Sequence, residues 1–181
     1  WVYADNQNLF KIYTYFGGFM NISVKRFTLI AMLLAMTIVL SSFSIPVPGG
    51  HLYFNDLVIV TAALMLNPVE AFIVGGLGSF LGDLFFYPTP MFVSLVTHGL
   101  QAVVISLLIS KKENQTLKDY IFAVTIGAII MVVGYTIGRA FIYANPQTAM
   151  LKLPFQIVQA SFGAIMAVIL HTRLPLKKFL K

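Results

Sequence analysis

The sequence predicts an all-α fold: a polytopic membrane bundle of six transmembrane helices with both termini in the cytoplasm. The first reason is composition, because 59% of the residues are hydrophobic, only 10% are charged, and the mean hydropathy is +0.87. Soluble domains contain roughly 25% charged residues. The second reason is length, since 181 residues accommodate about six apolar helices of roughly 20 residues each and no second soluble domain. The third is the distribution of the basic residues.

Six apolar segments, separated by turn residues such as proline, glycine and asparagine, define the expected helices. They span residues 27–45, 55–66, 69–86, 91–109, 119–143 and 150–171. Prolines and glycines after the first segment predict a loop through Phe54. Asn67-Pro68 predicts a tight turn, with the proline in the first turn of the next helix. We therefore treat residues 20–181 as one six-helix membrane domain.

Residues 1–19 are aromatic and polar with little apolar continuity, so they are left out of the predicted bundle. Two interpretations stay open. The segment is either an N-terminal extension, added by cloning or by an extended start, or an amphipathic segment in the membrane interface. Lys25 and Arg26 precede the first apolar run, as in a signal peptide. That run exceeds the roughly 7–15 residues of a signal-peptide core, so it is assigned as the first helix.

Basic residues gather at three places that six spans put on one side of the membrane. They are Lys25 and Arg26, then Lys111, Lys112 and Lys118, then Arg173, Lys177, Lys178 and Lys181. The opposite loops contain no Lys or Arg, apart from Lys152 at the start of the last helix. Lysine and arginine accumulate in cytoplasmic loops, which places both termini in the cytoplasm. The net charge of +6 therefore reflects topology, and nucleic acid is not an expected partner.

Polar side chains inside the apolar segments predict a binding pocket. His98 and Gln101 lie roughly 10 and 15 Å along their helix from the outer side. Helical rise places several others at the same level, the outer half of the bundle. The candidate substrate-binding residues are Asn55, Asp83, His98, Gln101, Tyr135, Arg139, Gln156 and Gln159. The outer loop with His51 and Tyr53 could close over them.

Each of these residues also has a purely structural interpretation. His98 and the glutamines could hydrogen-bond between helices, and Arg139 could reach the outer interface or pair with Asp83. Asp56 and Glu70 are interpreted as charges favoured near helix N-termini. A pocket explains their common depth better than separate structural roles do.

Several patterns bear on other functions. The sequence contains no Gly-x-x-x-x-Gly-Lys phosphate loop and no His-Glu-x-x-His motif, and it has no cysteine. Its histidines lie at different depths, which speaks against a metal site. We therefore expect no catalytic residue, no metal and no cofactor in this chain, and a partner that supplies the energy for transport. An intramembrane enzyme using His98 and Asp83 ranks last.

Small residues four apart allow close helix packing in lipid. Such pairs are Gly78 and Gly82, Gly134 and Gly138, Ala160 and Ala164, and Ala31 and Ala35. Packing within the bundle is the general interpretation. Docking to another membrane protein is the alternative. It fits Ala31 and Ala35 best, because their segment has no ionisable group and few polar ones.

The chain resembles the substrate-binding S components of energy-coupling factor (ECF) transporters, in the branch of the pantothenate and hydroxymethylpyrimidine/pyridoxine carriers. The residues concerned are Asn55-Asp56-Leu57, Gly75-Gly76-Leu77-Gly78, Gly82-Asp83-Leu84, Tyr87-Pro88, Thr97-His98-Gly99-Leu100-Gln101, and Pro154-Phe155-Gln156 followed by Gln159 and Gly163. The resemblance implies a multi-pass protein of the bacterial cell membrane that binds one vitamin. It also implies docking, through Ala31 and Ala35, on a membrane T component with two ATPases that use ATP.

Arg139 stands where many relatives of this branch are expected to have an acidic residue. A guanidinium pairs bidentately with a carboxylate, which favours pantothenate as the ligand. Pyridoxine, hydroxymethylpyrimidine, and a structural or assembly role without a ligand are the alternatives.

Overall fold

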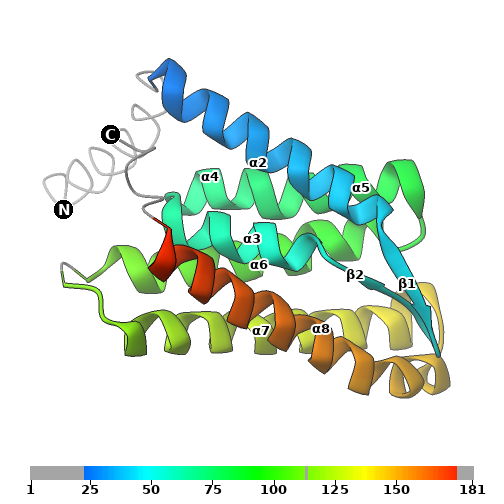
Figure 1. Ribbon diagram of the computed structural model, residues 1–181. Helices are drawn as coiled ribbons and strands as arrows, with labels where there is room; N and C mark the ends of the chain where they lie inside the picture. Colours follow the sequence, from blue (N-terminus) through cyan, green and yellow to red (C-terminus); the bar gives the residue numbers. More distant parts are fainter. Residues whose placement is uncertain (1–22, 113, 175–181) are drawn as a thin grey trace, which may run out of the picture.

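The computed structural model describes residues 23–112 and 114–174, and these form a membrane-type helical bundle (Figure 1). The structure does not describe the predicted N-terminal extension. The same is true of Lys177, Lys178 and Lys181, which belong to the C-terminal group of basic residues predicted to lie in the cytoplasm. In chain order the elements are α2 (Val24–Ser42), β1 (Ser44–Val47), β2 (Gly50–Tyr53), α3 (Asn55–Met65), α4 (Pro68–Phe72), η1 (Ile73–Leu77), α5 (Gly78–Phe86), α6 (Met91–Ser110), α7 (Leu117–Gly138), η2 (Arg139–Tyr143) and α8 (Pro146–Arg173).

The all-α membrane prediction is confirmed. Within the described residues, five helical segments are long and apolar enough to cross a membrane, and Pro68–Phe86 counts as one of them although η1 is a π-helical stretch inside it. The shorter apolar helix α3 occupies the place of the predicted second span. The predicted helix boundaries agree with the observed ones to within about one turn.

Local capping explains where the helices begin. Asn67 accepts a hydrogen bond from the Glu70 amide, while the Glu70 side chain accepts from the Asn67 amide, a reciprocal capping box. Asn145 caps α8 through its side chain, which accepts a hydrogen bond from the Thr148 amide, and Pro146 occupies the first helical position. The sequence predicted Glu70 only as a charge in the first turn of its helix. Its buried carboxylate also forms an ion pair with Arg26, with 2.7 Å between Arg26 Nε and Glu70 Oε1. This pair joins α2 to α4 at the end of the bundle where the basic residues gather.

The segment predicted as a loop after the first helix contains a β-hairpin, which corrects that expectation. Strands β1 and β2 pair antiparallel, with Ser44 opposite Tyr53 and Val47 opposite Gly50. The turn requires Gly49, whose φ of 80° is accessible to glycine without strain. The hairpin lies at the end of the bundle where α8 begins, opposite the end where α2 begins (Figure 1).

Small residues bring the helices into close contact, as the sequence predicted. A Cβ added at Gly78 would lie 2.9 Å from the Thr37 side chain of α2, and one at Gly134 would lie 2.7 Å from Thr97 of α6. Packing within the bundle therefore explains these glycines. Ala31 and Ala35 differ, because they lie on an exposed face of α2.

Candidate functional site

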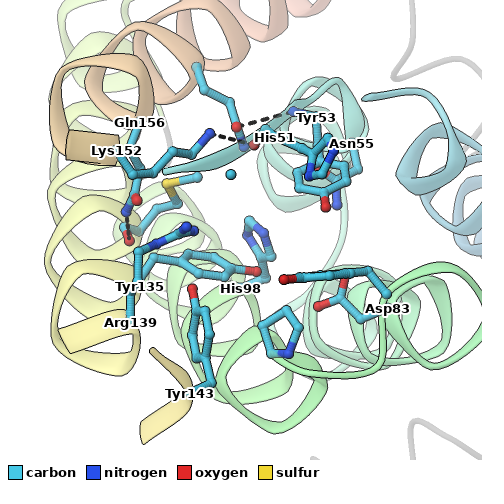
Figure 2. A pocket seen from close by; sticks show the side chains of 15 residues that line it. His51, Tyr53, Asn55, Asp83, His98, Tyr135, Arg139, Tyr143, Lys152 and Gln156 are labelled. Atoms are coloured by element: carbon cyan, nitrogen blue, oxygen red, sulfur yellow. Dashed lines mark hydrogen bonds between the residues drawn. The ribbon is translucent and has the colours of Figure 1, made fainter. Parts of the chain in front are cut away.

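A pocket opens at the hairpin end of the bundle (Figure 2). It contains about 540 Å³ of empty space, counting the part open to solvent. Its walls come from the hairpin, α3, α5, α6, α7, η2 and α8. The lining residues are Gly50, His51, Tyr53, Asn55, Asp83, Tyr87, Pro90, His98, Met131, Tyr135, Arg139, Tyr143, Lys152, Gln156 and Gln159.

All predicted binding residues except Gln101 line this pocket. Gln101 is buried behind it, and its Oε1 lies 2.8 Å from Nδ1 of His98. Because the amide oxygen of Gln101 can only accept, Nδ1 of His98 donates in this contact. Gln101 therefore contacts His98 and is not among the residues that line the pocket. The predicted docking residues Ala31 and Ala35 are not among the lining residues.

Two cationic side chains hold the hairpin over the pocket. Arg139 of η2 donates a hydrogen bond to the carbonyl of Gly49, and Lys152 of α8 donates one to the carbonyl of His51. The sequence had left open whether Arg139 pairs with Asp83. In the described part of the chain the two form no ion pair.

Asp83 belongs instead to a chain of hydrogen bonds along one wall. The hydroxyl of Tyr135 donates to Ser94 Oγ at 2.5 Å, and the hydroxyl of Ser94 donates to Asp83 Oδ2. The carboxylate of Asp83 faces the pocket opposite Arg139 and Lys152 (Figure 2). Because Ser94 and Tyr135 fix its orientation, Asp83 can accept a hydrogen bond from a ligand without first being ordered.

A second set of polar contacts joins α3, α6, α8 and the hairpin below the pocket. Gln159 donates from Nε2 to Asp56 Oδ2 at 2.6 Å, and its Oε1 accepts from the Tyr53 amide at 3.1 Å. The other Asp56 oxygen lies 3.8 Å from Nδ1 of His98. The sequence predicted Asp56 only as a charge near a helix N-terminus, but its carboxylate also contacts Gln159 and His98. It connects the pocket wall to the hairpin.

Tyr53 is the pocket tyrosine that lies on the hairpin. Burial, assisted by the negative charge of Asp83, raises the pKa of Tyr53 to about 12. The phenol therefore stays protonated at neutral pH and can donate a hydrogen bond into the pocket.

Sequence reasoning missed Lys152, Tyr87 and Met131 as pocket residues. For Lys152 a signal existed, because it is the one basic residue on the side where the loops otherwise contain none. A lone cation at that depth needs a partner or a cavity. Tyr87 and Met131 have no comparable signal, since aromatic and methionine residues are common on any helix of this kind.

Comparisons with known proteins agree with this architecture. A family model described as the S component of ECF-type riboflavin transporters matches residues 21–176. The thiamine precursor transporter HmpT of Lactococcus lactis subsp. cremoris is 34% identical over 155 residues, which cover 83% of this chain and 87% of that protein. An uncharacterized protein of Pyrococcus woesei is 30% identical over 133 residues, covering 72% of this chain and 88% of that protein.

These matches support the predicted resemblance at the level of the S component, and they lend no support to the pantothenate branch in particular. The family model spans all of the described residues. The chain therefore belongs to the family of S components of ECF-type vitamin transporters.

Proposed function

We propose that this protein captures a small water-soluble vitamin, or a vitamin precursor, in the pocket beneath the hairpin. The observation that carries the proposal is the convergence of polar side chains from six helical elements on one cavity in an otherwise apolar bundle. Such groups are costly in a membrane unless they bond each other or line a cavity with a function. Family membership supports the same role.

The ligand that the pocket fits best has a planar heteroaromatic ring. Aromatic rings lie around the cavity, with ring centres 6.2 Å apart for His51 and Tyr87 and 5.2 Å apart for His98 and Tyr135. Asp83 and Asn55 add acceptors for a ring amino or hydroxyl group. The relative named as a thiamine precursor transporter makes a pyrimidine precursor the first candidate for this chain. Riboflavin, from the name of the family model, is the second.

Replacing Asp83 with asparagine tests this site. We expect calorimetric titration of the detergent-purified chain to show binding of 4-amino-5-hydroxymethyl-2-methylpyrimidine or riboflavin. Losing the charged acceptor should weaken binding by about 1.5–3 kcal/mol, or roughly 10- to 150-fold. Asp119→Asn is the matched control. Asp119 lies near the start of α7, at the end of the bundle away from the pocket, and this variant should bind like the wild type. A folded chain that binds neither compound would rule out this ligand assignment.

We further propose that α2 docks the chain on a membrane T component whose two ATPase partners hydrolyse ATP. The exposed face of α2 supports this, because Ala31 and Ala35 let a partner helix approach closely. Changing both alanines to leucine should abolish co-purification with the T component and leave calorimetric ligand binding intact. Thr125→Leu, on the exposed surface of α7, is the control. Undiminished co-purification of the double variant would exclude this face of α2.

A further inference from the structure

We propose that the ligand carries an anionic group, a carboxylate or a phosphate monoester, and that Arg139 and Lys152 bind it. This inference rests on the proposed function and assigns the chemical class of the ligand. It also assigns Lys152 a role in specificity. Both cations line the pocket, from the neighbouring elements η2 and α8 (Figure 2).

Neither cation forms an ion pair with a carboxylate in the part of the chain that the structure describes. Within residues 23–112 and 114–174, the ion pairs are those of Arg26 with Glu70, Lys112 with Asp119 and the His98–Asp56 contact, so Arg139 and Lys152 take part in none. Their charged groups contact the carbonyls of Gly49 and His51, and the Arg139 guanidinium also lies 5.4 Å from the ring centre of Tyr143. Carbonyl dipoles satisfy hydrogen bonds without neutralising charge.

Burial makes this arrangement costly. Lys152 is only 2% exposed, and removing an ammonium group from water is unfavourable unless an opposite charge compensates it. The Nε of Arg139 is also buried and has no hydrogen-bond partner. A guanidinium with a free N–H is suited to a planar or tetrahedral oxyanion. An anionic group of the ligand would supply both the missing charge and the missing acceptor.

The opposite wall has the complementary chemistry. Asp83 and Asn55 face Arg139 and Lys152 across the cavity (Figure 2). The Oδ1 atom of Asn55 is buried without a partner, and Asp83 is held by Ser94 on its Oδ2 atom. These acceptors would repel an anion and bind a donor. The ligand is therefore expected to be bipolar, with an N–H or O–H group toward Asp83 and the anion toward Lys152.

The experiment compares matched pairs of compounds that differ in the anionic group, by calorimetric titration of the full chain. The pairs are the hydroxymethylpyrimidine above with its monophosphate, riboflavin with flavin mononucleotide, and panthenol with pantothenate. We expect the anionic member of at least one pair to bind about 10- to 100-fold more tightly. The pair that shows the preference distinguishes phosphate from carboxylate.

Variants assign the preference to the two cations. Arg139→Gln and Lys152→Gln should each reduce the preference for the anionic compound to less than about threefold. Lys152→Arg should retain the preference, because arginine keeps the positive charge. Lys112→Gln, at the opposite end of the bundle, should leave it unchanged. The Lys152→Arg comparison remains informative if a glutamine variant does not fold.

Three results would overturn the inference. Neutral members that bind as tightly as the anionic ones would refute it while leaving the proposed function intact. A preference that persists in both glutamine variants would place the anion elsewhere. No binding by any compound would overturn the proposed function, and this inference with it.

Discussion

Replacing Gln159 with leucine is expected to lower the free energy of unfolding by about 2–5 kcal/mol. This side chain donates to Asp56 Oδ2 at 2.6 Å and accepts from the Tyr53 amide at 3.1 Å. Leucine has a similar size and can make neither bond. The variant would leave Asp56 Oδ2 and the Tyr53 amide without these hydrogen bonds, so the buried carboxylate would keep only its 3.8 Å contact with His98. Removing the partners of a buried charge is among the most destabilising changes in a protein.

Thermal unfolding in detergent without ligand measures this effect. Gln156→Leu is the matched control, since Gln156 is also buried and lies one turn earlier on the same helix. It donates to the carbonyl of Val132 at 3.0 Å and, at 3.4 Å, to that of Met131. The Val132 carbonyl keeps a hydrogen bond from the Thr136 hydroxyl in the variant. We expect its loss to cost only about 1 kcal/mol. Equal destabilisation by the two variants would show that the Asp56–Gln159 contact contributes no more to stability than the hydrogen bond of Gln156 does.

Replacing Gly163 with leucine is expected to separate α8 from α3 and to weaken ligand binding. A Cβ at this position would lie 2.7 Å from Asp56 Cβ and 3.2 Å from the Asp56 backbone carbon. The backbone of α3 cannot move aside to make room for the leucine, as the end of a flexible side chain could. Helix propensity favours leucine over glycine by about 1 kcal/mol, but overpacking costs about 1–3 kcal/mol or more. We expect these opposing effects to leave a net destabilisation of up to about 2 kcal/mol.

The functional loss should exceed the loss of stability. Asn55 lines the pocket one residue before Asp56, so a displaced α3 moves the pocket wall. Calorimetric titration should show at least tenfold weaker ligand binding, while thermal unfolding still shows a cooperative transition. Ser161→Ala, on the exposed side of α8, should change neither measurement. Normal ligand affinity in Gly163→Leu would mean that the contact between α3 and α8 does not shape the site.

The bundle and much of the pocket could be predicted because both depend on one-dimensional patterns. Long apolar runs ended by residues such as Asn67 and Pro146 define helices, and a rise of about 1.5 Å per residue gives the depth of each polar side chain. Depth alone brought His98, Arg139 and Gln156 to one level. Helical spacing of three and four residues also placed Gln101 beside His98, although it could not show which of them faces the cavity.

The partners of these side chains could not be predicted, because they depend on how the hairpin folds. Strands β1 and β2 have four residues each, and Pro46 lies within the first, so neither shows a strand pattern. Without the hairpin, the carbonyls of Gly49 and His51 were not available as partners for Arg139 and Lys152. Arg139 therefore had only Asp83 as a visible partner in the sequence, and the structure replaces that pair with a backbone contact.

The most direct test of the pocket is native mass spectrometry of the protein extracted from membranes of cells grown in vitamin-rich medium. We predict one small molecule bound per wild-type chain. Combining Asp83→Asn with Lys152→Gln should remove this molecule, while the Ala31→Leu, Ala35→Leu variant should retain it. A ligand that stays at full occupancy on the pocket variant would contradict the assignment of this cavity as the binding site.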